Sequence, residues 1–363
     1  MRAAVMYSWN EPFAVEEVEL AAPRQGEVRV KLAASGVCHS DLSIQRGILP
    51  MPPPRIIGHE GAGVVEEIGP GVTSVAPGDH VILCWMSPCG HCKDCGRGRP
   101  AHCEVALQAM MTGTTYDGSA RFTVKGQDVP HWVGSFAEQT VVPETACVKI
   151  RTDAPLDKAC LVGCGVMTGI GAVLNTARVE PGASVAVFGA GGVGLNVIQG
   201  AVLAGAEKII AVDLLDTKLK LAREFGATHT VNASKEDPEG GIRGLTEGRG
   251  VDYAFEVIGS PKVIAQAFAS LRRAGKAIIV GAPPFGSEVT IPAFPISMEE
   301  KSLIGSFYGT PRFHYDMPRI VDLYMAGRLK LDQLVTKTFA LKEINKAFEA
   351  MEQGSVARGV IAY

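Results

Sequence analysis

Four cysteines stand close together in the stretch PCGHCKDCGRGRPAHC, residues 88 to 103: Cys89, Cys92, Cys95 and Cys103. Thiolates at such short spacing can close a tetrahedral Zn²⁺ site whose four sulfurs leave no open position, which suits a structural ion better than a catalytic one. Gly90 and Gly96 let the loop fold back around an ion. Two disulfides or four reduced thiols are the alternatives. In a reducing compartment, clustered cysteines indicate a metal site first.

Three further stretches contain residues of metal-ligand type outside this loop. They are Cys38, His39, Ser40 and Asp41 in SGVCHSD, His59 and Glu60 in IIGHEGAG, and Cys164 in GCGVMTG. A lone cysteine or histidine is more often a core or surface residue than a ligand. Taken one at a time, none of the three stretches predicts a site.

The stretch GAGGVG at 189 to 194 places Gly189, Gly191 and Gly194 in the G-x-G-x-x-G spacing. It follows the apolar run SVAVF and opens a helical pattern, so backbone amides at the start of that helix would face a pyrophosphate. The next predicted strand ends in Asp213, where a carboxylate binds the adenosine ribose and repels a 2′-phosphate. No arginine follows within DLLDTKLK. The pattern predicts NAD over NADP; the alternative is a glycine-rich turn that binds nothing.

The composition is that of a soluble globular protein. The chain has 363 residues, 47% of them hydrophobic and 20% charged, and this length favours two domains. A net charge of −3 offers no basic stripe for nucleic acid. The first residues, MRAAVMYSWNEPF, contain no apolar core before a cleavage site, and the longest apolar run, 161 to 174, is short for a bilayer span. We expect a cytoplasmic protein with no nucleic-acid or membrane partner.

The elements that must position these residues are of two kinds. In the first part, short runs such as EVRVKL, GAGVVEEIG and DHVIL, separated by Gly and Pro, predict a small β-barrel domain. From about residue 175, apolar strands alternate with amphipathic helices such as 216–226 and 262–275, which predicts a doubly wound parallel sheet. Its six predicted strands are 184–189, 208–213, 228–233, 251–259, 276–282 and 302–307. We expect the last fifty or so residues to rejoin the first domain.

Together these stretches resemble the zinc-dependent, medium-chain alcohol dehydrogenase family over essentially the whole chain. The matching segments are GVCHSDL, GHEGAGVVEEIGPGV, PCGHCKDCGRGRPAHC, GCGVMTGIGA, GAGGVG before an acidic strand end, and the closing SVARGVIAY. The resemblance implies a discontinuous GroES-like β-barrel catalytic domain, residues 1–165 and 307–363, with a structural zinc lobe at 88–104. It also implies a Rossmann NAD-binding domain, residues 166–306, and an active site in the cleft between the two domains.

The resemblance further implies roles for single residues. Cys38, His59 and Cys164 would bind a catalytic zinc ion with one position open, while Asp41 and Glu60 would stand just behind them, Glu60 also as an alternate ligand. The four-cysteine loop would hold a second, structural zinc ion. Ser40 would pass the alcohol proton toward the cofactor ribose. The implied cofactor contacts are His39, Thr168, Gly189, Gly191, Gly192, Val193, Gly194, Asp213, Lys218, Val280 and Arg358. The implied substrate pocket consists of Leu49, Trp85, Trp132 and Val133.

By this resemblance the chain is expected to interconvert a primary, secondary or aromatic alcohol and its aldehyde or ketone, with NAD as cofactor. Two positions depart from the pattern: His39 stands where many members have an arginine, and Ser43 stands where several have a histidine that completes the proton relay. The alternatives are a polyol or glutathione-dependent formaldehyde dehydrogenase, a non-catalytic NAD-binding structural protein and a redox-sensing thiol protein. The expected assembly is a homodimer through paired Rossmann sheets, with a tetramer as the alternative.

Overall fold

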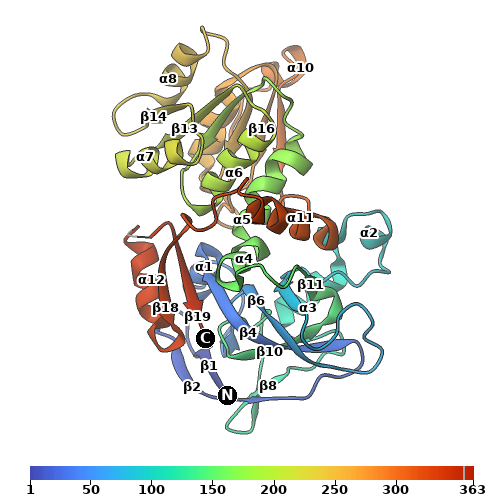
Figure 1. Ribbon diagram of the computed structural model, residues 1–363. Helices are drawn as coiled ribbons and strands as arrows, with labels where there is room; N and C mark the ends of the chain where they lie inside the picture. The colour runs from blue at the N-terminus through green and yellow to red at the C-terminus, as the bar shows by residue number, and fades with distance from the viewer. Residues whose placement is uncertain (355) are drawn as a thin grey trace. The chain divides into compact units, whose positions relative to one another are not determined.

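The structure is a computed structural model that describes residues 1–354 and 356–363 (Figure 1). Ser355, the first residue of the closing SVARGVIAY segment, lies outside the described residues. The chain divides into two compact units, unit 1 (Met1–Cys164 with Arg312–Tyr363) and unit 2 (Gly165–Pro311). The second division falls at 311/312 instead of the expected 306/307. The reason is that 306–311 pack on unit 2, where Asn175 Nδ2 donates to Gly309 O at 3.3 Å.

Unit 1 is built mainly of antiparallel strands. These are β1 (Arg2–Met6), β2 (Ala14–Glu17), β3 (Glu19–Leu20), β4 (Glu27–Val37), β5 (Arg55–Ile56), β6 (Glu60–Ile68), β7 (His80–Leu83), β8 (Phe122–Val124), β9 (Gln127–Val129), β10 (Gln139–Pro143), β11 (Cys147–Lys149), β18 (Val335–Ala340) and β19 (Arg358–Ala362). Its α-helices are α1 (His39–Gln45), α2 (Lys93–Gly96), α3 (Glu104–Thr112), α4 (Leu156–Ala159), α11 (Phe313–Met325) and α12 (Ile344–Glu352). Short 3₁₀ turns cover Pro100–His102, Glu144–Ala146, Cys160–Gly163 and Leu341–Glu343.

The long strand β4 organises unit 1. One edge of β4 pairs with β6, and the other edge pairs with β10 along its first half and with β19 along its second half. Most of its side chains are buried, in keeping with its place inside a seven-stranded sheet of order β11-β7-β6-β4-β19-β18 with β10 beside β4. Because β19 comes from the end of the chain, the C-terminal residues complete the sheet that the N-terminal residues begin.

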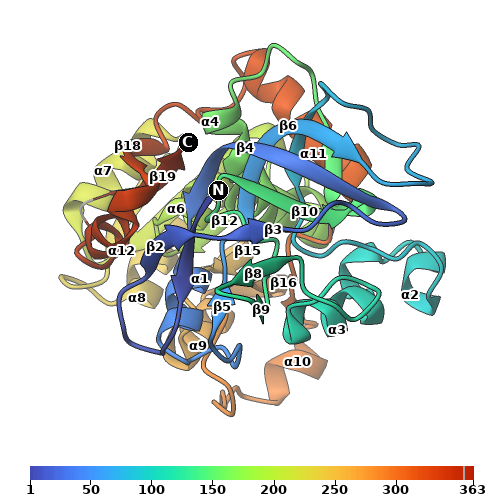
Figure 2. The same cartoon turned by 90° about the horizontal axis from the view of Figure 1, so that it is seen from below.

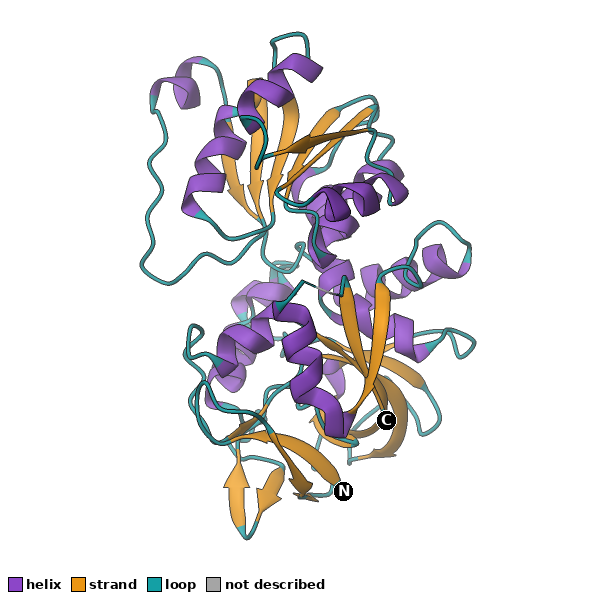
Figure 3. Cartoon of the chain, turned by 90° about the vertical axis from the view of Figure 1, so that its left-hand side faces the viewer, coloured by secondary structure: helices purple, strands orange, loops and turns teal. Residues whose placement is uncertain are grey.

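Unit 2 contains one parallel sheet of six strands. They are β12 (Ser184–Phe188), β13 (Lys208–Asp213), β14 (His229–Asn232), β15 (Val251–Glu256), β16 (Leu271–Ile279) and β17 (Ser302–Gly305), in the order β14-β13-β12-β15-β16-β17. The helices are α5 (Gly165–Gly171) continued by a π-helical segment Ala172–Ala177, α6 (Gly192–Leu203), α7 (Asp216–Glu224), α8 (Pro238–Leu245), α9 (Pro261–Ala269) and α10 (Phe294–Met298). Figure 3 shows helices on both faces of this sheet. The predicted doubly wound sheet is present.

Several predicted boundaries in unit 2 were wrong, and the cause of two of them is visible. The helix expected at 262–275 ends at Ala269, because Leu271 pairs in parallel with Val251 and Ala274 has a φ of +58°, which no helix accommodates. The strand expected at 251–259 ends at Glu256, because the Glu256 carboxylate accepts the backbone N–H groups of the next turn. The helix therefore ends at a tertiary contact, the pairing of Leu271 with Val251, whereas the strand ends at a local turn capped by the Glu256 side chain.

Each unit buries its own apolar cluster. The core of unit 1 gathers side chains of β4 with Phe13, Phe136 and Phe348, and the core of unit 2 gathers those of β12 and β13 with Phe268.

In the described chain no single helix is long and apolar enough to cross a bilayer; only the bent pair 156–163 and 165–177 reaches that length together.

Candidate active site

Unit 1 brings Cys38, His59, Glu60 and Cys164 together. Each offers one ligand atom, and these atoms all lie within 4.8 Å of one another on four buried side chains. Cys38 is the N-cap of α1 at the end of β4, and His59 directly precedes β6, the strand that pairs with β4. Cys164 follows the 3₁₀ turn Cys160–Gly163. The three ligands expected from the sequence therefore share one site.

Asp41 orients the imidazole of His59. Its Oδ1 lies 2.9 Å from Nδ1, and its Oδ2 accepts the backbone N–H of Cys38 at 3.3 Å. The opposite ring nitrogen, Nε2, is buried without a hydrogen-bond partner among the described residues. Burial disfavours the charged ring, yet Asp41 and Cys38 together raise the pKa of His59 to about 10. An orphaned nitrogen beside two thiols is the arrangement that a metal ion completes.

The two thiols of this site compete for a proton. Hydrogen bonding with Cys164 lowers the pKa of Cys38 well below its ordinary value, against the effect of burial, and the same bond raises the pKa of Cys164. Metal binding to thiols and imidazole displaces such protons. Two sulfurs and one imidazole are the donor set of a catalytic zinc site with one open position, so the residues present fit a zinc ion.

Glu60 pairs with Arg358, the first residue of β19. The two side chains form a buried ion pair, 0% and 7% exposed. Burial opposes the charge on both side chains; it raises the pKa of Glu60, whereas Glu60 raises the pKa of Arg358. Gly36 in β4 pairs with Glu60 in β6. A Cβ on Gly36 would collide with the Glu60 carboxylate, so glycine leaves the space that the ion pair occupies. The pairing gives Arg358 a partner in unit 1; its contact with a pyrophosphate stays a prediction.

The first turn of α1 carries the remaining predicted residues of unit 1. Ser40 Oγ lies 3.8 Å from Cys38 Sγ, and the side chain is half-buried. His39 is exposed and lines an open hollow together with residues of α12, among them Glu349. Ser43 is half-buried one turn further along the same helix. The helix thus leads from the ligand Cys38 to the surface.

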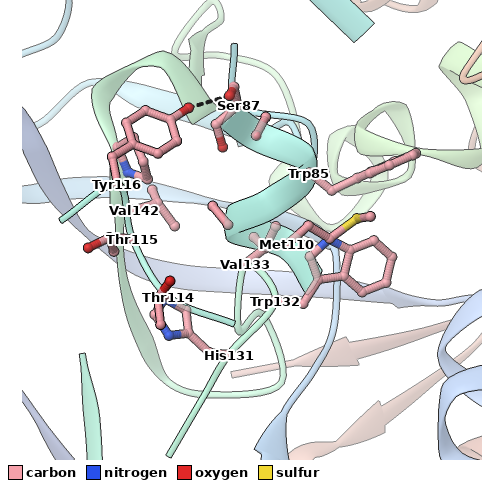
Figure 4. A pocket seen from close by; sticks show the side chains of 13 residues that line it. Trp85, Ser87, Met110, Thr114, Thr115, Tyr116, His131, Trp132, Val133 and Val142 are labelled. Carbon is pink, nitrogen blue, oxygen red and sulfur yellow. Dashed lines mark hydrogen bonds between the residues drawn. The ribbon is translucent and has the colours of Figure 1, made fainter. Parts of the chain in front are cut away.

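Three of the four predicted pocket residues line one cavity of about 40 Å³ (Figure 4). Trp85 and Trp132 contribute two indoles, with Met110 beside them, and Val133 follows Trp132. Leu49, the fourth, packs on the core of unit 1 and does not line this cavity. Trp132 also stacks on the ring of His59, at 4.3 Å between centroids, so the cavity wall reaches the candidate metal site.

Several lining residues were missed by the sequence reasoning. Among them are Met110, Thr114, Thr115, Tyr116 and His131. The last turn of α3 and the following loop carry four of them, and Tyr116 is fixed by a hydrogen bond to the backbone oxygen of Ser87. Among the described residues, the cavity lining contains no lysine or arginine. Nothing in the local pattern of α3 distinguishes a pocket wall from a helix that covers a core.

The four-cysteine loop forms the second cluster. The ligand atoms of Cys89, Cys92, Cys95 and Cys103 lie within 4.8 Å of one another, and all four are free thiols, so the disulfide alternative is wrong. Backbone amides point at the sulfurs: those of Cys89 and Ala106 donate to Cys103 Sγ at 3.3 and 3.4 Å. Such donors stabilise thiolates. Figure 2 shows α2 of this lobe at the rim of unit 1, near α3. The lobe fits a structural zinc ion.

The glycine motif lies where β12 turns into α6. Gly189 has a φ of +103°, and a Cβ on Gly194 would meet the backbone oxygen of Gly189, so both positions need glycine for the tight approach of strand and helix. Gly192 and Val193 form the first turn of α6. Asp213 ends the neighbouring strand and accepts the N–H of Ala190 at 2.8 Å. Amides at a helix start beside an acidic strand end fit a dinucleotide.

Three other predicted cofactor contacts are half-buried in unit 2. Thr168 lies in α5, Lys218 in the first half of α7, and Val280 directly after β16. Val280 N donates to Glu256 O at 2.8 Å, which holds it at the carboxyl end of the sheet. That end carries Asp213 as well, and it is the edge at which open parallel sheets bind ligands.

Comparison with known proteins agrees with this geometry. Residues 24–152 match the family described as alcohol dehydrogenase GroES-like domain, and residues 192–326 match zinc-binding dehydrogenase. A relative from Paracoccus denitrificans, an S-(hydroxymethyl)glutathione dehydrogenase, is 43% identical over 373 residues, covering 100% of this chain and 99% of its own. The GroES-like domain joined to a Rossmann-type sheet is thereby confirmed.

Comparison with solved structures indicates the same family. An alcohol dehydrogenase zinc-binding domain protein from Burkholderia ambifaria is 36% identical, with a TM-score of 0.96, covering 99% of this chain and 98% of its own. A benzyl alcohol dehydrogenase from Acinetobacter calcoaceticus is 34% identical, with a TM-score of 0.95 and the same coverage. Both metal-type clusters and the glycine motif lie in the parts of the chain that these proteins match. The chain therefore belongs to the zinc-dependent, medium-chain alcohol dehydrogenase family.

Proposed function

We propose that this chain is an NAD-linked alcohol dehydrogenase that uses one catalytic and one structural zinc ion. The observation that carries the proposal is the buried set of Cys38, His59 and Cys164, in which the Nε2 nitrogen of His59 has no partner in the described chain. A protein that had kept only a structural or redox role would not need three converging ligands beside a cavity walled by Trp85 and Trp132.

The residues of the chain divide the work as follows. When bound, zinc supplies Lewis acidity to the alcohol oxygen, and NAD accepts the hydride. Asp41 holds Nδ1 of His59, so that Nε2 faces the site. The hydroxyl of Ser40, 3.8 Å from Cys38 Sγ, receives the alcohol proton. The proton then leaves along α1, where Ser43 and the exposed His39 take the place of the usual relay histidine.

Asp213 supports NAD as the cofactor. Its carboxylate already accepts the N–H groups of Ala190 and Leu214, both at 2.8 Å, and this fixes it at the end of β13. A fixed negative charge there accepts hydrogen bonds from a ribose and repels a 2′-phosphate. Lys218 on the following helix is the first cation after Asp213 in sequence, and we assign it to the ribose.

The indole walls of the cavity, rather than its volume of about 40 Å³, favour an apolar, flat alcohol. Trp85, Trp132, Met110 and Val133 provide apolar walls, and a benzyl alcohol dehydrogenase shares the fold with a TM-score of 0.95. S-(hydroxymethyl)glutathione is the second candidate, because a relative of 43% identity bears that name. Glutathione has two carboxylates that need cationic partners, and the cavity has no lysine or arginine. We therefore place aromatic primary alcohols first.

A substrate panel tests the proposal. Ethanol, butanol, benzyl alcohol and S-(hydroxymethyl)glutathione are compared by kcat/KM with NAD and with NADP, after zinc has been counted by metal analysis. Two zinc ions per chain and the highest kcat/KM for benzyl alcohol with NAD are expected. A preference for S-(hydroxymethyl)glutathione would move the substrate to the second candidate. One zinc ion, or no turnover of any alcohol, would overturn the assignment as an enzyme.

We also propose that the chain forms a homodimer through the edge of the unit 2 sheet. The edge strand β17 and the preceding α10 carry exposed apolar side chains: Phe294 67%, Met298 64% and Leu303 38%. An uncovered edge strand with apolar neighbours is a template for a second strand. Light scattering should give twice the chain mass, and Leu303→Lys should give the monomer.

Nine free thiols suit a reducing compartment, so we place the protein in the cytoplasm.

A further inference from the structure

Trp132 covers one face of the His59 ring. The ring centroids are 4.3 Å apart, and the rings lie 20° from parallel. Both side chains are buried, with exposed fractions of 5% and 1%. The edge of the imidazole is held separately, because Nδ1 lies 2.9 Å from Asp41 Oδ1. The hydrogen bond fixes the direction of the ring edge, whereas the indole blocks any tilt out of the ring plane. Two groups therefore hold the ring from perpendicular directions.

The segment that carries Trp132 is bonded to the segment that carries His59. Trp132 N donates to Ile56 O at 3.0 Å, and Ser135 N donates to Gly58 O at 3.1 Å. Residues 132–136 thus run beside residues 56–58, which lead directly into His59. The distance between indole and imidazole is set by these backbone bonds and does not depend on flexible side chains.

A tight turn at Val133 fixes where the indole points. Val133 has a φ of +54°, a left-handed conformation that β-branched residues rarely adopt. Gly134 N donates to Trp132 O across the turn, and Thr140 Oγ1 donates to Val133 O at 2.5 Å. A buried valine keeps such a conformation only where its surroundings over-determine it. The turn is therefore a fixed feature that presents Trp132 to His59.

Trp85 approaches the same ring differently. Its ring stands perpendicular to His59, with the centroids 6.3 Å apart, and it meets Trp132 edge to face at 5.6 Å. It lines the same cavity and is also an indole, but it covers no face of the imidazole. The protein thus provides a matched comparison between two tryptophans of one pocket.

We propose that Trp132 is a positioning residue for the catalytic metal. By covering the face of His59, it keeps Nε2 directed at the thiols of Cys38 and Cys164 and slows the release of a zinc ion from this site. The inference rests on the zinc site of the proposed function. Groups that orient a metal ligand typically change metal affinity by about 10- to 100-fold. Trp132 supplies this orientation by contact with a ring face, whereas Asp41 supplies it by a hydrogen bond.

The test measures how fast the purified, zinc-loaded protein gives up zinc to the chelator 4-(2-pyridylazo)resorcinol. The wild type is compared with Trp132→Leu, Trp132→Phe and Trp85→Leu. His59→Ala, which keeps only the four-cysteine site, identifies the release phase that belongs to that lobe. Lobe release then serves as the reference in every variant, because no changed residue contacts its four sulfurs.

Trp132→Leu should release the zinc ion of the Cys38, His59 and Cys164 site about 10- to 100-fold faster than the wild type. Trp132→Phe, which keeps a flat ring, should restore most of the slow release, and Trp85→Leu should leave the rate near that of the wild type. In cobalt-substituted protein, Trp132→Leu should also alter the visible absorption of the site. If Trp132→Leu does not fold, Trp132→Met, whose flexible side chain fills irregular gaps and lacks the flat face, replaces it.

Unchanged release from Trp132→Leu would overturn the inference, and so would equal acceleration by Trp85→Leu. The proposed function fails in a different way. A wild type that holds zinc only in the four-cysteine lobe would overturn the proposed function and this inference together, whereas two zinc ions with identical release rates in all variants overturns this inference alone.

Discussion

Single side chains set the chemistry of the cluster formed by Cys38, His59 and Cys164. Asp41 has no exposed surface, and it receives both the His59 ring and the backbone N–H of Cys38. One carboxylate therefore orients two of the three expected zinc ligands. Glu60 and Arg358 form a second buried pair beside them, so the charges near the site are matched before any ion is bound.

Replacing His59 should remove one zinc ion and the activity. In His59→Ala only Cys38 and Cys164 of the ligand set remain, too few for a tight site. Metal analysis should fall from two zinc ions to one, and turnover should drop by several orders of magnitude. NADH binding, followed by fluorescence, should persist, because the glycine motif and Asp213 belong to unit 2. Retained turnover would contradict the assignment of the catalytic site.

His131 should make stability depend on pH. Burial lowers the pKa of His131 from 6.5 to about 4. The unfolded chain therefore binds a proton first as the pH falls, so stability is complete above pH 6.5 and declines between pH 6.5 and 4. This decline approaches about 3 kcal/mol at pH 4. In His131→Gln it should be absent, as urea unfolding across this range would show. Identical pH profiles for the two proteins would refute the effect.

Helices and strands bring the site residues together, and local sequence patterns predicted some of these residues but not others. The spacing from Gly189 to Asp213 is contained in one strand-helix-strand unit, so its sequence was enough to place both. The cysteine lobe is local too. The contact of Trp132 with His59 was not predictable, because it depends on a left-handed valine and on pairing between segments about 75 residues apart. A pocket wall is likewise defined across elements: Leu49 packs on the core of unit 1, and its contact with substrate stays a prediction.

The strand end at Asp213 should control cofactor choice. Asp213→Gly removes the charge and also the acceptor for Ala190 N, so NAD binding should weaken while relative activity with NADP rises. Asp213→Asn is the matched control, since an amide oxygen can still accept that N–H. In both variants the NADP to NAD ratio of kcat/KM should rise about tenfold, equivalent to about 1.4 kcal/mol. An unchanged ratio in both would count against the role of β13.

The start of α3 couples the cysteine lobe to the cavity. Cys103 is the N-cap of α3, and its sulfur accepts the N–H of Ala106, a residue that lines the cavity. In Cys103→Ser the hydroxyl can still cap the helix, but a zinc ligand is lost. One zinc ion should be missing, and the melting temperature should fall by about 10 °C or more. Cys147→Ala, at a buried thiol outside both clusters, should keep two zinc ions. A Cys103→Ser protein that keeps them as well would refute the lobe.

At the scale of the molecule, the order of strands follows from alternating strands and helices in unit 2 but not in unit 1. Parallel strands joined by helices have few allowed orders. In unit 1, short antiparallel strands permit many strand orders. The position of β19 beside β4 is set by residue pairs such as Gly36 with Val360, and no local sequence pattern predicts such pairs. Both expected metal sites lie in unit 1, and the expected glycine motif lies in unit 2.

The ion pair between Glu60 and Arg358 also sets an order of events during synthesis. The partners are separated by 298 residues, with all of unit 2 made between them. The cysteine lobe spans few residues and can close as soon as it leaves the ribosome, whereas Glu60 must wait for its cation until β19 emerges. A nascent chain can therefore carry a finished lobe and a folded unit 2 while the Glu60 carboxylate still faces water, and only the arrival of Arg358 seals it.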